Sequence, residues 1–189
     1  YSQSFLKLFS ECRPVIRAPY NLFLYWEAEF HKWAVDIPFH NLNNKDFSLK
    51  EDEDIVGVFH CLSHAMKKNP HLIHMVKLKS WTKSKSILGI SYDLFRILTG
   101  EDGEGYDKET REILLKFPGL LVLEEGHNGW NEQSLVWKAL RKVETEKHIL
   151  LSGMNIKDLY NTLCVVSPKF AADLEQKWGS LNSSTDKNA

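Results

Sequence analysis

The stretch LLVLEEGHNGWNEQSLVWKAL, residues 120–140, carries the pattern that decides the fold. Four apolar residues are followed by two adjacent carboxylates, Glu124 and Glu125, and then by a polar turn and an amphipathic run. This order predicts a buried strand, a loop and a helix. Neighbouring carboxylates repel each other and disfavour each other's ionisation. Either the two point to opposite sides, as neighbours on a strand do, or a cation lies nearby.

Short apolar runs alternate with segments of helical spacing along the rest of the chain. This alternation predicts an α/β fold of three layers, in which helices cover both faces of a mostly parallel sheet. Asn21 is expected to cap the helix that begins there. We expect strands at 13–18, 37–42, 86–92, 120–124 and 148–152, and helices at 2–11, 21–33, 55–68, 93–99, 107–117, 131–142, 155–165 and 168–178.

The length of 189 residues suits one domain, which we expect to cover residues 1–178. Residues 43–85 are expected to form an insertion or linker, and the polar residues 179–189 a disordered tail. The chain begins with Tyr1 rather than methionine, so we expect further sequence upstream.

Bulk composition excludes several classes of protein. The formal net charge of −1 gives no overall basic balance for nucleic acid, although a local patch stays possible. Cys12, Cys61 and Cys164 lie far apart and are odd in number, which indicates core thiols in a reducing compartment rather than disulfides. No apolar run reaches the length of a membrane span, so no membrane partner is expected.

Polar residues follow two of the predicted strands. In parallel α/β sheets ligands bind outside the carboxyl ends of the strands. A carboxylate that leaves a strand can hold Mg²⁺ through water, and a second can take a proton from an attacking water. On this stretch alone, a solvated loop after a strand is the favoured explanation of the same dipeptide. The residues expected at this edge are Glu124, Glu125, His127, Ser152 and Gly153.

The order of these segments resembles the first RecA-like lobe of the Swi/Snf-type helicase ATPases. The segment RPVIRAPYNLFLYWEAEFHKW resembles motif Ia, and Ser91-Tyr92 resembles motif Ib. The EEGH that begins at Glu124 resembles the DEAH box, and Ser152-Gly153 the start of motif III. The phrases DIPFHNLN, VKLKSW, SILGISYDLF and VLEEGH resemble the plant CLASSY branch, over about residues 5–170.

This resemblance implies a nuclear plant protein that uses Mg-ATP and meets DNA and chromatin. Its relatives help recruit RNA polymerase IV and promote small-interfering-RNA production and RNA-directed DNA methylation. The resemblance implies that Glu125 is the catalytic base, that Glu124 stands at the magnesium position through water, and that His127 links hydrolysis to a neighbouring motif. It places Pro19, Ser91 and Tyr92 on the DNA-facing surface.

Three departures from the family argue against activity. No G-x-x-x-x-G-K-[ST] loop occurs in the 189 residues, and truncation would explain its loss. After Ser152-Gly153 the family continues with Thr, whereas this chain has Met154 and a shortened segment. The second RecA-like lobe, with its arginine finger, is missing. We therefore expect no ATP hydrolysis by this chain, which is either a fragment of an ATPase or an inactive remnant or protein-interaction module.

Two further clusters have both a functional and a structural explanation. The group His60, Cys61, His64, His71 and His74 uses zinc-ligand residue types, but no Cys pair occurs, so we favour surface histidines and no structural metal. The basic stretch 67–85 around Trp81 could contact nucleic acid. We favour a solvated strand-and-loop face with Trp81 packed inward, because acidic stretches flank it.

Two smaller sets are expected to be structural. Trp26, Phe30 and Trp33 have helical spacing and are expected in the core. Cys164 is expected to be a buried thiol and not a nucleophile.

Overall fold

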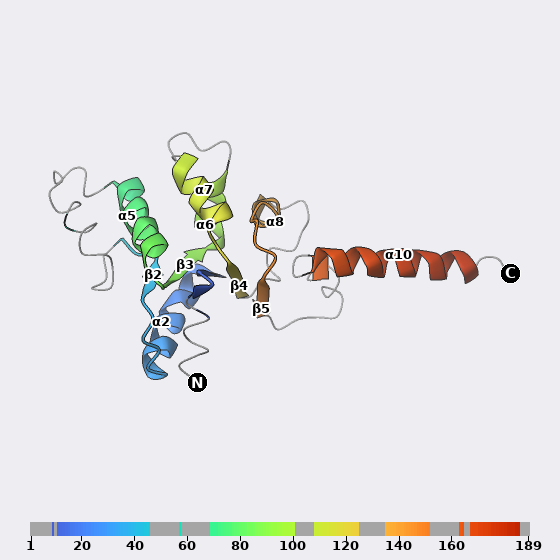
Figure 1. Ribbon diagram of the computed structural model, residues 1–189, viewed down its shortest axis with the longest axis horizontal. Helices are drawn as coiled ribbons and strands as arrows, with labels where there is room; N and C mark the ends of the chain where they lie inside the picture. Colours follow the sequence, from blue (N-terminus) through green and yellow to red (C-terminus); the bar gives the residue numbers. More distant parts are fainter. Residues whose placement is uncertain are drawn as a thin grey trace.

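A single five-stranded parallel sheet forms the centre of the protein, in the strand order β2-β3-β1-β4-β5 (Figure 1). The computed structural model describes residues 9, 11–45, 57, 69–100, 108–124, 135–151, 163–164 and 167–185. The strands are β1 (Pro14–Ala18), β2 (Phe39–Asn41), β3 (Ile87–Ser91), β4 (Leu120–Glu124) and β5 (His148–Leu151). The helices are η1 (Tyr20–Leu22), α2 (Phe23–Lys32), α5 (Pro70–Lys83), α6 (Tyr92–Thr99), α7 (Lys108–Lys116), α8 (Leu135–Leu140) and α10 (Pro168–Thr185).

The predicted class, an α/β fold with a parallel sheet, is confirmed. Each of the five predicted strands is present, and the ends differ from the prediction by one or two residues. All residues of β1 and β3 are buried, because these strands have neighbours on both sides and helices on both faces. Among the described residues, no helix combines the length and apolar character needed to cross a membrane.

Helices α5, α6, α7 and α8 lie on one face of the sheet, here called the α5–α8 face, and α2 lies on the other, the α2 face (Figure 1). The strands alternate between these faces, since successive side chains of a strand point to opposite sides. The core of the α5–α8 face includes Val15, Ile90, Leu123, Trp81, Phe95 and Leu114. The core of the α2 face includes Ile16, Ala18, Ile87, Val122 and Phe23, with Phe9 and Cys12 packed against it.

Helix α5 corrects the prediction that residues 43–85 are only a linker or a strand-and-loop face. Asn69 caps this helix, since its side chain accepts a 2.9 Å hydrogen bond from the amide of His71, and Pro70 stands in its first turn. Leu78 and Trp81 are fully buried in the core of the α5–α8 face. The inward packing predicted for Trp81 is confirmed, and this part of the predicted linker belongs to the domain core.

Two helix ends also differ from the prediction. Asn21 does not cap α2, because the short helix η1 precedes it and Leu22 stands at the cap without a side-chain bond. Helix α10 continues to Thr185, beyond residue 178 where the tail was expected to begin. The predicted helices at 2–11, 55–68 and 155–165 lie almost wholly outside the described residues.

The aromatic side chains of α2 are only partly in the core. Trp26 and Phe30 pack against the core of the α2 face, with their ring centroids 5.6 Å apart. Phe30 also meets Phe39 of β2 edge to face at 5.5 Å. The core position predicted for Trp33 is wrong, since this side chain is 61% exposed and its indole N–H donates to Glu29 at 2.7 Å.

Candidate functional site

The carboxyl ends of β1, β3 and β4 lie next to one another in the middle of the sheet. The connections that leave the neighbouring strands β1 and β3 run toward opposite edges of the sheet. From β1 the chain passes over β3 to reach β2, and from β3 it passes over β1 to reach β4. Parallel α/β sheets bind ligands at such a switch point. The predicted site residues that the structure describes here are Pro19, Ser91, Tyr92 and Glu124. The predicted residues Glu125, His127, Ser152 and Gly153 lie outside the described residues.

Ser91 joins the end of β3 to two neighbours. Its hydroxyl oxygen caps α6 by accepting a hydrogen bond from the Leu94 amide at 3.3 Å. The same oxygen accepts from the Asn43 side-chain amide at 2.7 Å, and the Ser91 amide donates to the Asn43 side-chain oxygen at 2.8 Å. Ser91 is only 6% exposed, so these bonds fix the turn after β2 against the start of α6.

Tyr92 connects α6 to the acidic end of β4. Its hydroxyl donates a 3.1 Å hydrogen bond to the backbone carbonyl of Glu124. Glu124 is half-buried and is the last residue of β4, paired with Leu151 of β5. The start of α6 therefore holds the backbone from which the acidic pair leaves the sheet.

A buried lysine holds the turn that follows β2, and the sequence did not reveal it. Lys77 of α5 is 1% exposed, and its ammonium donates to the carbonyls of Asn41 at 2.9 Å and Asn44 at 2.7 Å. The Asn41 side chain accepts from the Asn43 amide at 3.1 Å and donates to Glu27 at 3.0 Å. The only signal in the sequence was the run NLNN after a short strand, which is typical of a turn.

A cavity of about 470 Å³ opens between this turn and the segment that begins at Tyr20. Side-chain amides from the turn supply donors and acceptors, and Lys45 supplies a positive charge. Tyr20 and Leu24 on its rim are 69% and 73% exposed. The lining residues are Tyr20, Asn21, Phe23, Leu24, Glu27, Asn41, Asn43, Asn44 and Lys45.

Arg17 places a cation inside the sheet, one register position before Glu124. It is 1% exposed in the middle of β1, pairs with Leu123 of β4, and lies 3.0 Å from the ring centroid of Phe95. None of its guanidinium nitrogens has a hydrogen-bond partner among the described residues. Burial lowers the pKa of Arg17 to about 9, and nearby Tyr92 acts in the opposite direction. Its side chain lies on the α5–α8 face, like that of its register partner Leu123, whereas Glu124 alternates to the α2 face, so Arg17 and Glu124 point to opposite faces of the sheet.

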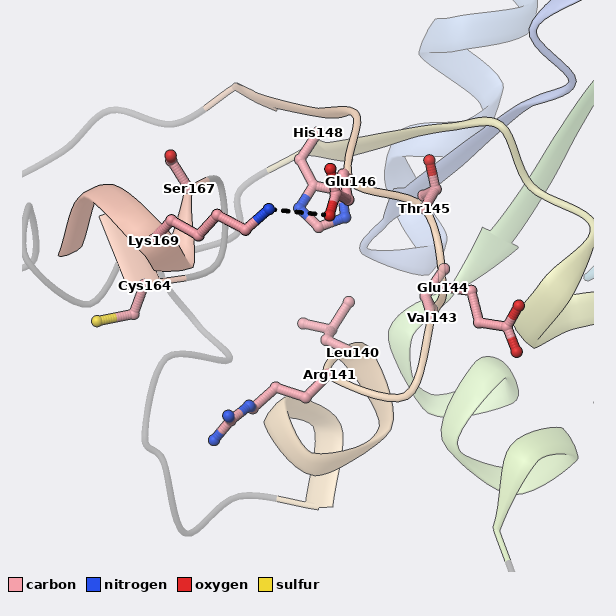
Figure 2. Close-up of a pocket in the computed structure, with 10 residues that line it drawn as sticks. All are labelled: Leu140, Arg141, Val143, Glu144, Thr145, Glu146, His148, Cys164, Ser167 and Lys169. Carbon is pink, nitrogen blue, oxygen red and sulfur yellow. Dashed lines mark hydrogen bonds and ion pairs between the residues drawn. The ribbon is translucent and has the colours of Figure 1, made fainter. Parts of the chain in front are cut away.

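A second cavity, of about 320 Å³, lies between the end of α8, the start of β5 and the start of α10 (Figure 2). Lys169 and Glu146 form an exposed ion pair at its mouth, with 3.5 Å between nitrogen and oxygen. Cys164 is half-buried, and Figure 2 shows its sulfur directed away from His148. Cys164 was expected to be buried, and the structure leaves it partly exposed. The cavity lies at the amino end of β5, on the opposite edge of the sheet from Glu124.

The histidine cluster is only partly described. His60, Cys61 and His64 lie outside the described residues, and His74 is 9% exposed on α5 rather than on the surface. Burial, with smaller effects from Lys77 and His71, lowers the pKa of His74 to about 4. Within the described ranges, no three His, Cys, Asp or Glu side chains come together as metal ligands.

The basic stretch does not form one positive surface on the described residues. Lys77 is buried, and two of the exposed lysines are paired with acids. Lys79 lies 3.3 Å from Glu109, and Lys85 lies 2.7 Å from Glu11.

The chain is similar to several proteins from Arabidopsis thaliana. SNF2 domain-containing protein CLASSY 3 is 43% identical over 97% of this chain. CLASSY 4 is 44% identical over 89%, and CLASSY 1 is 33% identical over 90%. The chain spans only 14% or 15% of the length of these curated relatives. No family model matches the chain.

One solved structure supports the fold. The Sulfolobus solfataricus SWI2/SNF2 ATPase core in complex with dsDNA matches with a TM-score of 0.52 and 19% sequence identity. The match covers 88% of this chain and 27% of that one. At this identity the likeness shows the fold alone, which is a RecA-like α/β lobe.

Proposed function

This chain is homologous to the CLASSY SNF2-domain proteins over about nine-tenths of its length, and on that premise we propose that it is part of a RecA-like lobe of a chromatin-remodelling protein. The lobe acts in the nucleus, in RNA-directed DNA methylation and small-interfering-RNA silencing, together with the RNA polymerase IV machinery. The observation that carries the proposal is Glu124 at the carboxyl end of β4, whose backbone carbonyl is held at the switch point by Tyr92.

Each acidic residue has a role in this proposal. Glu124 takes the magnesium position through water, and Glu125 takes the position of the base that orients the attacking water. His127, Ser152 and Gly153 link that site to neighbouring motifs. The 189 residues contain no G-x-x-x-x-G-K-[ST] loop, and Met154 stands where the family has Thr. We therefore assign no ATP hydrolysis to this chain alone.

Binding of a fluorescent ATP analogue to the purified chain, with and without Mg²⁺, tests the nucleotide site. Magnesium-dependent binding that is lost in Glu124→Ala would support a surviving site. Absence of binding by a chain that is folded by circular dichroism would support an inactive lobe. ATP turnover that is faster than that of Glu125→Gln would contradict our assignment of no hydrolysis.

DNA is the proposed ligand of the 470 Å³ cavity, whose lining begins at Tyr20. Pro19, Ser91 and Tyr92 follow or end strands at the same edge of the sheet but do not line the cavity. Side-chain amides and an exposed lysine match the acceptors and the charge of a phosphate backbone, and the Tyr20 ring offers a stacking surface. Fluorescence anisotropy of a labelled duplex provides the test. Lys45→Gln should weaken binding and reduce its salt dependence. Lys83→Gln, an exposed lysine on α5, is the matched control and should leave binding unchanged.

A second candidate is a protein-interaction module without ATPase activity. Met154, in place of the threonine expected after Ser152-Gly153, favours it, since a thioether cannot replace the hydrogen bonds of a hydroxyl. Met154→Thr in the longer natural protein distinguishes the two candidates. A gain of ATP turnover would favour a degenerate ATPase, and no gain would favour the interaction module.

A further inference from the structure

The cavity of about 470 Å³ contains a carboxylate that contact with a phosphate backbone does not explain. Glu27 of α2 lines this cavity, together with Lys45. A carboxylate repels phosphate, and in its ionised form it only accepts hydrogen bonds. The groups of a ligand that Glu27 can bind are therefore N–H donors rather than phosphates.

The Glu27 carboxylate is held in place through one of its oxygens. Its Oε1 atom accepts a 3.0 Å hydrogen bond from the side-chain amide of Asn41. Asn41 is itself oriented, because its side-chain oxygen accepts from the Asn43 amide at 3.1 Å and its backbone carbonyl accepts from Lys77 at 2.9 Å. Within the described residues, the structure shows no further hydrogen bond or ion pair of the Glu27 side chain. Its second oxygen thus remains an acceptor for a ligand.

Three other lining residues suit a flat ring that is linked to a phosphate. Tyr20 is 69% exposed, so its ring is accessible for stacking. The Asn21 side chain adds an amide with both donors and an acceptor, and Lys45 adds an exposed cation. The cavity volume falls within the roughly 300–1,000 Å³ of small-ligand pockets.

An unpaired nucleobase combines the chemistry that these residues can bind. The bases of a duplex are paired and stacked, so only a base that has left the stack can enter a concave site. Guanine presents two neighbouring donors on its Watson–Crick edge, the ring N1–H and the N2 amino group. Thymine presents one N–H between two carbonyl oxygens, which would repel the Glu27 carboxylate. The lining therefore favours guanine over thymine.

We propose that the 470 Å³ cavity binds an unpaired guanine of a single-stranded nucleic acid. The base stacks on Tyr20 and donates to Glu27, and Lys45 contacts the adjacent phosphate. The inference rests on the proposed function for the class of ligand, since both place nucleic acid in this cavity. It goes further because it gives the cavity a preference for one base.

Fluorescence anisotropy of short labelled thymidine strands, all at one salt concentration, tests the proposal. One strand carries a central guanosine, a second carries inosine in its place, and a third is all thymidine. We expect the guanosine strand to bind about fivefold or more tightly than the thymidine strand. Inosine lacks the N2 amino group and should lose most of this preference. Equal binding of the three strands, as DNA and as the corresponding RNA, would overturn the proposal.

Glu27→Gln tests the assigned acceptor with little change in shape. The new amide oxygen can keep the bond from Asn41, while the NH₂ group replaces the free oxygen and cannot accept a hydrogen bond. This variant should lose the preference for guanosine over thymidine. Glu29→Gln is the matched control, since Glu29 is exposed on the same helix and does not line the cavity. A guanosine preference that persists in Glu27→Gln would contradict the proposal.

Tyr20→Leu tests the stacking surface. It should weaken binding of the guanosine strand by about fivefold or more, because a base loses its aromatic partner. Tyr25→Leu is the control, since Tyr25 is 68% exposed on α2 but does not line the cavity. Equal losses in the two variants would contradict the assigned stacking.

A duplex in the same assay separates this inference from the proposed function. Duplex binding without any guanosine preference in single strands would leave the proposed DNA contact intact and overturn the inference. A guanosine preference in single strands without duplex binding would support the inference and contradict duplex DNA as the ligand. Absence of binding by every strand, with the chain folded by circular dichroism, would overturn both.

Discussion

Asn43 and Ser91 lie 48 positions apart in the sequence and hold each other through two hydrogen bonds at the carboxyl edge of the sheet. The Asn43 amide group donates to the Ser91 hydroxyl at 2.7 Å, and the Ser91 backbone amide donates back to the Asn43 oxygen at 2.8 Å. The Ser91 hydroxyl also caps α6. This pair joins the turn after β2 to the helix whose first residue, Tyr92, holds the end of β4.

Asn43→Ala and Ser91→Ala should each destabilise the fold by about 1–2 kcal/mol, through a lost cap or an unsatisfied buried amide. The double variant should lose less than the sum of the two, because both substitutions remove the same contact. Urea unfolding of the three variants measures this coupling. Asn21→Ala is the control, since Asn21 makes no cap and should change stability by less than about 0.5 kcal/mol. Additive losses would show that the contact contributes nothing.

Arg17→Met should stabilise the chain by on the order of 1–3 kcal/mol. The guanidinium is fully buried without a hydrogen-bond partner among the described residues, and an apolar side chain of similar length avoids that desolvation. The stacking on Phe95 offsets only part of the cost. Thermal unfolding measures the change.

Arg13→Met is the control for Arg17→Met. Arg13 is exposed, and its guanidinium lies 4.1 Å from the ring centroid of Phe117. Its replacement should therefore leave the stability of the chain nearly unchanged or lower it slightly. A clear loss of stability in Arg17→Met would contradict the prediction and would mean that the guanidinium has an anionic partner.

His74 should make the protein less stable as the pH falls from about 6.5 to 4. The pKa of His74 is about 4 in the folded state, whereas the ordinary value of 6.5 applies to the unfolded chain. Between these two values the unfolded chain binds a proton that the folded chain does not. His74→Gln should flatten this part of the pH profile, measured as the urea midpoint against pH. His31→Gln, an exposed control, should keep the slope. An unchanged slope in His74→Gln would assign the pH dependence to other groups.

The strands, and the position of Glu124 at the carboxyl end of β4, could be predicted because the local sequence determines them. Each strand is a short apolar run, and the acidic pair at Glu124 directly follows one of them. Helix α5 could not be predicted in the same way, because its buried side mixes polar and apolar residues. His74, Lys77 and Ser80 are buried together with Leu78 and Trp81, so the apolar period of a helix is lost.

The contacts that organise the carboxyl edge of the sheet could not be predicted from the sequence, for a different reason. Lys77 meets Asn41 from 36 positions away, and Asn43 meets Ser91 from 48. Such contacts depend on the order of strands in the sheet, which local spacing does not encode. The error at Asn21 has a local cause, since the residue after Pro19 enters a short 3₁₀ turn before α2 begins.

Lys77→Met should destabilise the protein by about 1–3 kcal/mol, although it removes a buried charge. The methionine fills similar space, but it leaves the carbonyls of Asn41 and Asn44 without their buried donor. The turn after β2 should then loosen, and DNA binding at the cavity that it lines should weaken too. Urea unfolding and duplex anisotropy measure the two effects.

The control for Lys77→Met is Lys79→Met on the same helix. Lys79 is exposed and its ion pair with Glu109 is solvated, so stability should change by less than about 1 kcal/mol. Full stability in Lys77→Met would mean that water replaces the ammonium at both carbonyls. Lost stability with unchanged DNA affinity would show that the turn after β2 is not part of the DNA-binding surface. A loss of both stability and DNA affinity in Lys77→Met, with Lys79→Met unaffected, would show that α5 positions the DNA-facing edge through one buried lysine. The sequence did not reveal α5 as a helix, so this role could be found only from the structure.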